Sequence, residues 1–318
     1  MNAHRVIRLV VVTCSLALPF GGVPAGIAKD GDHGAAAKER FDFEKLPGKN
    51  GPTYSAKGLD VAAILQKHGL KLLQGRQDFI AGRGVDLRYA YTRQPAAPAA
   101  DGARAKADAP AKPVPYDDFF MHVGATPRDA QEMLFALELG DRRSMVITDY
   151  LDGFERSDGV GYFCIVRKKN SKVQSLLFAR GNMAFSLHGL GDADVMETLM
   201  AAAKDIDAAV QKQPVMTEKD WAGIPTAQVA APKLGLFEVG KEVAIPVTVK
   251  PPLAEGQSVV TACDSDGSSG SYDPATGVVS WNPTQPGQYH LGIGVYDKAL
   301  RMIRWTMVEV EVKAGPAK

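Results

Sequence analysis

Acidic residues in the C-terminal third form the arrangement best suited to metal chemistry. Asp264-Ser-Asp-Gly267 places two carboxylates two residues apart, and Asp273 follows in the same segment. Calcium prefers several oxygen ligands from a compact acidic loop. Asp264, Asp266 and Asp273 are therefore the candidate calcium ligands. An EF-hand loop also needs a third acidic position and a distal glutamate, which this segment lacks, so a solvated turn is the alternative.

A thiol–imidazole pair is the second arrangement that could do chemistry. Cys164 could pair with His122 or His188 and act as a nucleophile. However, Cys164 lies in Tyr162-Phe-Cys-Ile-Val166, which is apolar on both faces and favours a buried core thiol. An enzyme would instead be indicated by a cleft that gathers His122, His188, Asp149 or Asp152.

Other catalytic and cofactor motifs do not occur in the sequence. The histidines are isolated, and there is no His-Glu-x-x-His zinc motif or Walker loop. Gly267-Ser-Ser-Gly270 does not form a nucleophile elbow, and Gly189-Leu-Gly191 lacks the third glycine of a dinucleotide loop. We therefore predict no catalytic residue and no cofactor-binding residue, and we consider the protein more consistent with binding than with catalysis.

The charge balance and the N-terminus restrict where the protein works and what it binds. The chain has 318 residues with 37 basic and 36 acidic side chains, so it lacks the basic field of a nucleic-acid-binding protein. Residues 1–28 have a positive start, an apolar run from Leu9 to Phe20 and small residues before Ala25 and Ala28, as in a secretory signal peptide. We expect export to the periplasm or the cell exterior, and no later segment long enough for a transmembrane helix.

The elements that would position these residues suggest two domains. Residues 29–57 form a flexible lead-in, and residues 58–212 an α+β domain in which helices pack on an antiparallel sheet. Periodicity predicts helices over 60–68, from Thr126, and over 194–210, and strands over 85–91, 145–150, 161–167, 173–179 and 183–187. Residues 94–115, almost wholly Ala, Pro, Lys, Asp and Gly, form a disordered insertion.

Residues 213–232 are a linker, and residues 233–313 alternate as an all-β sandwich would. The last strand changes parity, from Ile303 and Trp305 to Val308 and Val310, which predicts a β-bulge near Met307. Cys164 and Cys263 fall in different predicted domains. Two buried thiols or one interdomain disulfide are both compatible with this placement.

A recognisable pattern runs from Asp273 to Tyr289: Asp-x-x-Thr-Gly-x-x-Ser-Trp-x-Pro-Thr-x-x-Gly-x-Tyr. It resembles the immunoglobulin-like, or cadherin-like, domains of bacterial secreted and surface proteins. The resemblance covers the last quarter to third of the chain and implies an immunoglobulin-like β-sandwich. In that fold Trp281 should fill the space between sheets, and Tyr289 should hydrogen-bond back to the preceding connection. It also implies a role in adhesion, in protein or carbohydrate binding, or as a spacer.

These observations support two hypotheses of different class. The first is an exported, non-enzymatic protein that binds a protein or glycan partner. The alternative is an enzyme or sensor with its site in the α+β domain and the sandwich as an accessory module. The basic turn Arg167–Lys172 adds a local contact point for an anionic glycan or lipid head group, or simply a charged hairpin that protects a strand edge.

Overall fold

The computed structural model describes residues 48, 50–93, 117–139, 154–170, 173–190, 194–230, 233–263 and 269–315. The predicted signal peptide, most of the lead-in, the insertion 94–115 and the strand predicted over 145–150 lie outside these residues. Two of the three candidate calcium ligands, Asp264 and Asp266, also lie outside them.

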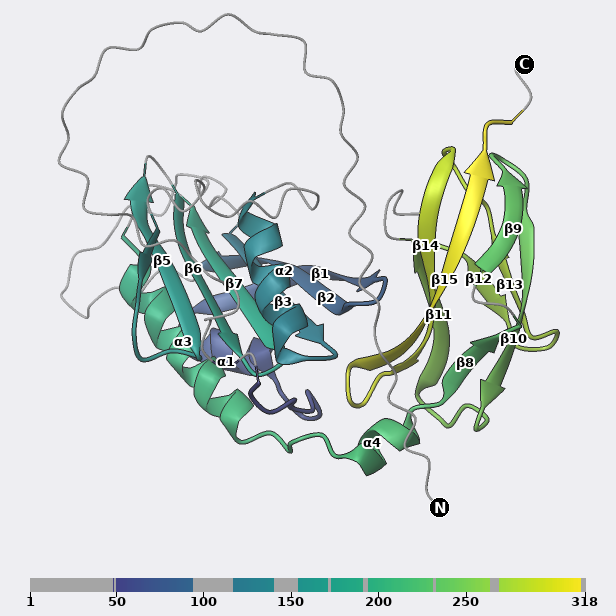
Figure 1. Cartoon of the computed structure of the whole chain (residues 1–318). Helices are drawn as coiled ribbons and strands as arrows, with labels where there is room; N and C mark the ends of the chain where they lie inside the picture. Colours follow the sequence, from purple (N-terminus) through teal and green to yellow (C-terminus); the bar gives the residue numbers. More distant parts are fainter. Residues whose placement is uncertain are drawn as a thin grey trace, which may run out of the picture. The chain divides into compact units, whose positions relative to one another are not determined.

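The N-terminal part is built around one antiparallel sheet of strand order β1-β2-β3-β7-β6-β5-β4 (Figure 1). Its described elements are, in chain order, α1 (Val61–Lys67), β1 (Leu70–Ile80), β2 (Gly84–Arg93), β3 (Asp117–Gly124), α2 (Pro127–Leu139), β4 (Phe154–Arg156), β5 (Phe163–Asn170), β6 (Val173–Arg180), β7 (Met183–Leu190) and α3 (Met196–Gln211).

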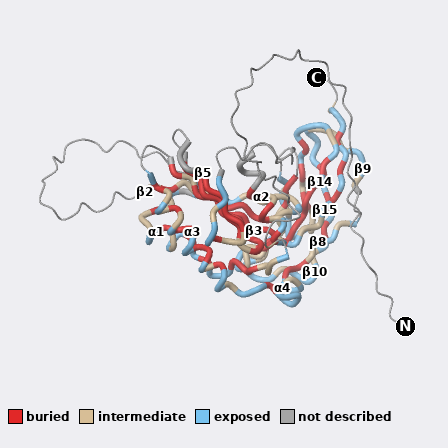
Figure 2. The backbone as a smooth tube through the Cα atoms, turned by 60° about the vertical axis from the view of Figure 1, so that its left-hand side comes forward, coloured by how far each residue is buried: buried red, intermediate tan, exposed pale blue. Residues whose placement is uncertain are grey.

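Both faces of this sheet are covered. Side chains of α1 and α3 share one core cluster with alternate residues of the strands, including Phe119, Phe178 and Phe185. The neighbouring residues along the strands point to the opposite face, where α2 lies on β3, β6 and β7. Consequently the central strands are buried along most of their length, as the red segments of Figure 2 show.

Local sequence signals explain where the helices begin. Asp60 accepts a hydrogen bond from the backbone N–H of Ala63 and caps α1. At α2, the Thr126 hydroxyl accepts from the Asp129 N–H, and the Asp129 carboxylate accepts from the Thr126 N–H in return. Burial raises the pKa of Asp129, and the hydrogen bonds that its carboxylate accepts from the Thr126 hydroxyl and the Thr126 N–H act against this shift.

The predicted α+β class is wrong. Strands account for 51 % of the described residues, and the four helices among them are short, so the described chain is mostly β. The three predicted N-terminal helices are present as α1, α2 and α3, but the sequence pattern missed three strands, β1, β3 and the short β4. These strands add to β2 and β5–β7, so the sheet dominates the N-terminal part.

The C-terminal part contains two four-stranded sheets, with strand orders β12-β13-β10-β8 and β11-β14-β15-β9. Its described elements are α4 (Glu218–Gly223), β8 (Thr226–Val229), β9 (Lys233–Glu238), β10 (Val243–Lys250), β11 (Gln257–Cys263), β12 (Ser271–Asp273), β13 (Val278–Trp281), β14 (Gly287–Asp297) and β15 (Met302–Lys313). Strand β9 runs parallel to β15, whereas the other neighbouring strands described in these two sheets pair antiparallel.

Two residues singled out from the Asp273–Tyr289 pattern are placed as predicted. Trp281 is fully buried in a cluster that holds side chains from both C-terminal sheets. The Tyr289 hydroxyl donates toward the backbone oxygens of Pro286, at 2.9 Å, and Gln285, at 3.1 Å, in the connection before β14. The bulge predicted near Met307 is wrong for the β14–β15 ladder, because its register runs without a shift from Gly287 to Asp297.

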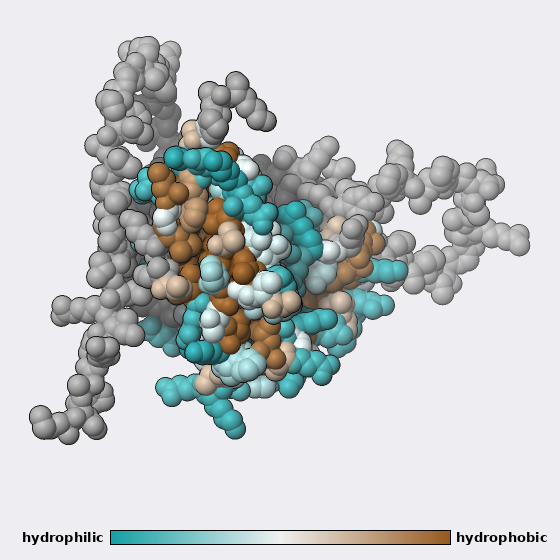
Figure 3. Space-filling view, turned by 90° about the vertical axis from the view of Figure 1, so that its right-hand side faces the viewer, coloured by the Kyte–Doolittle hydropathy of each residue, from teal (hydrophilic) through white to brown (hydrophobic). Residues whose placement is uncertain are grey.

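Apolar side chains also reach the surface. Figure 3 shows a band of them between hydrophilic residues on the face turned to the viewer. The exposed large apolar residues in the described part of the chain are Leu73, Val215, Leu236 and Met307. Among the described helices, none combines the length and the apolar character needed to cross a membrane.

Candidate functional site

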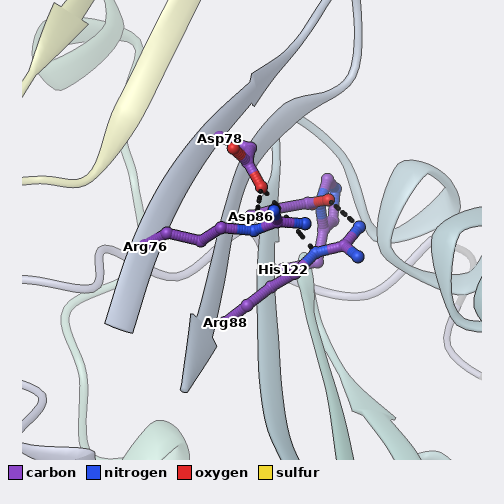
Figure 4. A network of polar contacts seen from close by, with 5 residues as sticks. All are labelled: Arg76, Asp78, Asp86, Arg88 and His122. Atoms are coloured by element: carbon purple, nitrogen blue, oxygen red, sulfur yellow. Dashed lines mark hydrogen bonds and ion pairs between the residues drawn. The ribbon is translucent and has the colours of Figure 1, made fainter. Parts of the chain in front are cut away.

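Polar side chains gather on the α2-facing side of β1, β2, β3 and β7. Residues two apart along a strand point to the same face, so the register of the sheet aligns them in rows. The first row consists of Asp78, Asp86 and His122, and the second of Arg76, Arg88, Phe120 and Ser186. The sheet thus places two arginines, two aspartates and a histidine from three adjacent strands side by side (Figure 4).

A buried ionisable pair lies at the centre of this arrangement. His122 Nδ1 is 2.7 Å from Asp86 Oδ1, and both side chains have no exposed surface. The other oxygen of Asp86 accepts a hydrogen bond from an Arg88 nitrogen at 3.3 Å. An isolated buried carboxylate is very unfavourable, so the two partners are what make Asp86 tolerable in the interior.

The second ring nitrogen of His122 faces the start of α2. His122 Nε2 is buried and has no hydrogen-bond partner among the described residues. A Cβ added at Gly124 would lie 3.2 Å from this nitrogen and 2.8 Å from Asp129 Cβ. The missing side chain of Gly124 is therefore what lets the imidazole and the first turn of α2 approach each other.

The network continues from Asp86 toward the surface through the two arginines. Asp78 Oδ2 lies 3.0 Å from Arg76 Nε and 3.9 Å from Arg88 Nε. Exposure increases outward, from 33 % for the Arg88 side chain to 67 % for that of Arg76. The Arg88 guanidinium also lies over the Phe120 ring, 5.3 Å from its centroid. Its Nε is buried and makes no hydrogen bond with any described residue.

His188, on β7, has two hydroxyl partners and lines the same hollow as the two arginines. The Ser186 hydroxyl is 2.6 Å from His188 Nε2, and the Ser175 hydroxyl is 2.9 Å from His188 Nδ1. Both serines are buried, whereas His188 is half-buried. In a neutral imidazole one ring nitrogen donates a hydrogen bond and the other accepts one. One serine hydroxyl would therefore accept a hydrogen bond from His188, and the other would donate one to it.

These groups border a hollow of about 560 Å³. This volume lies within the range of small-molecule binding sites. The charged and polar side chains that line it are Arg76, Arg88, Asp118, Ser186 and His188, and the remaining lining residues are Gly75, Tyr89, Ala90, Phe119 and Phe120. A hollow of about 600 Å³ on the opposite face of the same strands is lined mainly by apolar residues and lacks such a network. The polar hollow is therefore the candidate site.

The structure gives little support to the predicted calcium ligands. Asp273, the one described member, is exposed and accepts hydrogen bonds from the Ala275 N–H and the Thr276 hydroxyl. The Thr276 hydrogen bond, ahead of that from Ala275, lowers the pKa of Asp273. These bonds are those of a tight turn. Within the described residues, no three His, Cys, Asp or Glu side chains lie close enough together to hold a metal ion.

Cys164 is not brought together with either histidine. It belongs to the core cluster on the α1 and α3 side of the sheet, whereas His122 and His188 belong to the opposite face. Burial raises the pKa of its thiol to about 12. Cys263 is also buried, and no disulfide joins the two residues. The structure therefore supports core thiols and gives no support to a thiol–imidazole pair.

Cys164 should consequently resist alkylation until the chain unfolds. In a variant with Cys14→Ser and Cys263→Ser, iodoacetamide at pH 8 should react on the order of 1,000-fold more slowly with the folded protein than with the protein in urea, because the folded thiol is almost never ionised. Mass spectrometry of the alkylated peptide measures both rates. Equal rates in the two states would contradict a buried, unionised thiol.

Sequence reasoning found part of this site. The sequence predicted that a functional cleft would gather His122 and His188. Only His188 lines the hollow, whereas His122 lies on the same side of the sheet without lining it. Asp149 and Asp152 are outside the described residues. The arginines, Asp78, Asp86 and the two serines were missed. One signal was present: Val85–Tyr91 was predicted as a strand, and its alternate residues Asp86 and Arg88 are oppositely charged.

Comparison with known proteins adds no assignment. No protein-family model matches the chain, and no curated protein matches it. The immunoglobulin-like resemblance of the C-terminal part therefore stays a prediction, and function is argued from the site alone.

Proposed function

We propose that the protein is an exported, non-enzymatic binding protein and that its ligand occupies the polar hollow beside Arg88. Export is supported by the signal-like residues 1–28. The observation that carries the binding role is Arg88 itself. Arg88 lines the hollow, its side chain is 33 % exposed, and its buried Nε–H makes no hydrogen bond with a described residue.

The surroundings of Arg88 favour binding because they fix its position before any ligand arrives. Asp86 accepts a hydrogen bond from one guanidinium nitrogen, and the guanidinium lies over the Phe120 ring. Asp86 is in turn held by His122 in the fully buried interior. A side chain that is already ordered loses little conformational entropy when a ligand binds, so more of its interaction energy appears as affinity.

Arg88→Met should therefore weaken ligand binding strongly. Loss of a hydrogen bond to a charged donor costs about 1.5–3 kcal/mol, or roughly 10- to 150-fold in affinity. A screen of polar small molecules and glycans by thermal shift supplies ligands, and calorimetry then compares the wild type with the variant. Arg156→Met is the matched control, because Arg156 is an exposed arginine on β4 of the same sheet and does not line the hollow.

Two results would contradict this proposal. One is the absence of any ligand in the screen. The other is a ligand whose affinity falls equally in Arg88→Met and Arg156→Met, which would place binding elsewhere. Far-ultraviolet circular dichroism is the control that checks whether the Arg88→Met variant folds. Ser186→Ala changes a second lining residue and tests the same hollow independently.

A second candidate function is acyl transfer, favoured by the 2.6 Å contact between Ser186 Oγ and His188 Nε2. A serine nucleophile needs a base at this distance. However, Ser186 is only 1 % exposed, and a hydroxyl occupies His188 Nδ1, where a hydrolase triad has a carboxylate. Labelling by a fluorophosphonate that is lost in Ser186→Ala would support the enzyme, and unlabelled protein would support binding.

A further inference from the structure

We infer that the ligand of the polar hollow is a small organic acid whose single carboxylate binds the terminal nitrogens of Arg88 and Arg76. This inference rests on the proposed binding function and deepens it, because it names the chemical class of the ligand. The open edges of the two guanidiniums, the charges that line the hollow and the apolar part of the lining all support it.

The two arginines keep the guanidinium edge that a carboxylate needs. Arg76 contacts Asp78 through Nε at 3.0 Å. Arg88 contacts Asp78 through Nε at 3.9 Å and donates to Asp86 from one terminal nitrogen at 3.3 Å. In the described part of the chain, these aspartates are the only hydrogen-bond and ion-pair partners of the two guanidiniums. Each terminal nitrogen carries two N–H groups, so the edge between the two terminal nitrogens still offers a parallel pair, which can bind both oxygens of a carboxylate.

The sheet register places the two arginines next to each other. Arg76 and Arg88 are directly opposite in the β1–β2 ladder, where Cβ atoms lie about 4.5–5.5 Å apart. Like charges in such a pair destabilise a sheet. Asp78 compensates part of this repulsion, and the dashed contacts of Figure 4 join it to both arginines. A carboxylate bound in the hollow would compensate more of it from the open side.

The charges that line the hollow match an anion with one negative charge. With histidine counted as neutral, the charged lining residues Arg76, Arg88 and Asp118 sum to +1, and one carboxylate brings this sum to zero. Asp78 and Asp86 do not line the hollow, but they contact the arginines and reduce the positive field that reaches it. A phosphate or sulfate with two negative charges would therefore exceed the charge available to it.

The lining also lacks the backbone donors that favour a phosphate. Phosphates commonly bind at the N-terminus of a helix, where free N–H groups point at the ligand. The described residues that line the hollow all belong to the strands β1, β2, β3 and β7. The arginine side chains are therefore the main anion-binding groups of this lining, and their flat edges suit a planar carboxylate.

The remaining lining can hold the body of an organic acid. Tyr89, Ala90, Phe119 and Phe120 contribute to it, and the hollow of about 560 Å³ has room for a ligand larger than a carboxylate alone. Apolar surface that the ligand removes from water adds to its affinity in proportion to the area. We therefore expect an acid with an apolar body, for which benzoate is a simple probe.

The experiment compares benzoate, benzamide and inorganic phosphate on the purified full-length protein by ligand-observed NMR and calorimetry. Benzamide has the shape of benzoate without its charge. Benzoate should bind with a Kd on the order of 1 mM, and the other two probes at least about tenfold more weakly. Raising sodium chloride from roughly 0.05 to 0.5 M should weaken benzoate about threefold, because salt screens a partly exposed ion pair. Equal affinities for benzoate and benzamide would overturn the inference.

Arg88→Lys tests the two-point contact with the carboxylate. Lysine keeps the positive charge but replaces two parallel N–H groups with a single ammonium. Benzoate affinity should fall about fivefold in Arg88→Lys. It should be unchanged in Arg156→Lys, because Arg156 is an exposed arginine on β4 that does not line the hollow. Arg76→Lys repeats the test at the more exposed arginine, and circular dichroism checks the fold of each variant. If neither lining variant weakens benzoate, the inference is wrong.

Asp118→Asn tests the sign of the charge on the ligand. Asp118 is exposed, lines the hollow, and lies two residues along β3 from Phe120, the cross-strand partner of Arg88. Its negative charge opposes a bound anion, so its removal should strengthen benzoate about two- to threefold. Asp158→Asn is the control and should have no effect, because Asp158 is exposed and does not line the hollow. Weaker binding in Asp118→Asn would overturn the inference, since Asp118 would then act as an acceptor for the ligand.

The outcomes separate this inference from the proposed function. Phosphate that binds more tightly than benzoate and is lost in Arg88→Met would overturn the carboxylate inference and leave the binding site in place. Failure of all three probes would also overturn it, whereas a ligand from the broader screen that weakens in Arg88→Met would still support the binding function. The absence of any ligand in that screen, together with failure of the three probes, would overturn both.

Discussion

Replacing Asp86 with leucine is expected to lower the free energy of unfolding by about 3–5 kcal/mol, the usual cost of removing one partner from a buried ion pair. Asp86 has no exposed side-chain surface and joins two groups, His122 Nδ1 at 2.7 Å and an Arg88 nitrogen at 3.3 Å. The leucine would leave the buried imidazole N–H without an acceptor and would remove the anchor of Arg88. Urea titration followed by circular dichroism measures the loss.

Asp78→Leu is the matched control for this prediction. Asp78 belongs to the same network but is 40 % exposed, and it contacts arginines that are themselves partly exposed. Exposed ion pairs contribute about 0–1 kcal/mol, so this variant should be nearly as stable as the wild type. A loss below about 1 kcal/mol for Asp86→Leu would contradict the view that the Asp86–His122 pair organises the polar face.

His122→Asn refines the test. The asparagine amide can place a donor near the position of His122 Nδ1, so it should retain part of the hydrogen bond to Asp86, whereas His122→Leu cannot donate at all. The asparagine variant should therefore be the more stable of the two. The reverse order would indicate that His122 acts through packing alone.

The sequence predicted the helices well because their signals are local. Asp60 before α1 and Thr126–Asp129 at α2 combine a capping side chain with an apolar stripe, and both lie within a few residues of the helix start. Such signals do not depend on the rest of the fold. The same is true of the β5–β6 hairpin, in which a short connection joins two strands that pair with each other.

The fold class was wrong mainly because the two long strands that were missed, β1 and β3, lack the alternation that marks a half-buried strand. In β3, Phe119 and Met121 are buried on one face, and Phe120 and His122 on the other, so no polar face alternates with an apolar one. In β1, the register shifts between Leu72 and Gly75. This irregularity breaks the period of two on which the prediction relies.

The presence of apolar residues on both faces of β15 explains why the sequence wrongly predicted a bulge near Met307. Trp305 lies against Gly292 and Gly294, where an added Cβ would be only 3.0 Å and 2.7 Å from its ring atoms. The two glycines of β14 thus make room for a large aromatic side chain on the face opposite Val308 and Val310. The parity change in β15 comes from apolar residues on both faces, with no inserted residue in the β14–β15 ladder.

The candidate site was only partly predictable because sheet register assembles it. Asp86 and His122 are 36 residues apart, and Tyr91 donates a hydrogen bond to the His188 backbone oxygen across 97 residues. The sequence of one strand does not specify which residues of a neighbouring strand will pair with its own residues. Charged residues at alternate positions, such as Asp86 and Arg88, indicate a shared polar face, but their partners appear only when β1, β2, β3 and β7 are placed next to one another.

Trp281→Ala should be the most damaging change in the C-terminal part, with an expected loss of about 3–5 kcal/mol. Trp281 is fully buried and pairs across β13 and β10 with Val243. Its ring lies in the cluster that contains apolar side chains from both sheets, including Leu291 and Ile293. Ladders of backbone hydrogen bonds hold these strands in place, so the structure cannot collapse fully into the cavity, and the lost contacts are not replaced.

Three companion variants separate core filling from other roles of the same segment. Trp281→Phe keeps most of the aromatic volume and should cost clearly less than the alanine. Tyr289→Phe removes only the hydroxyl that reaches Pro286 and Gln285, and should cost about 1 kcal/mol. Trp221→Ala tests a half-buried tryptophan on α4. If Trp281→Ala were no more destabilising than Trp221→Ala in urea titrations, burial between the two sheets would not be what Trp281 contributes.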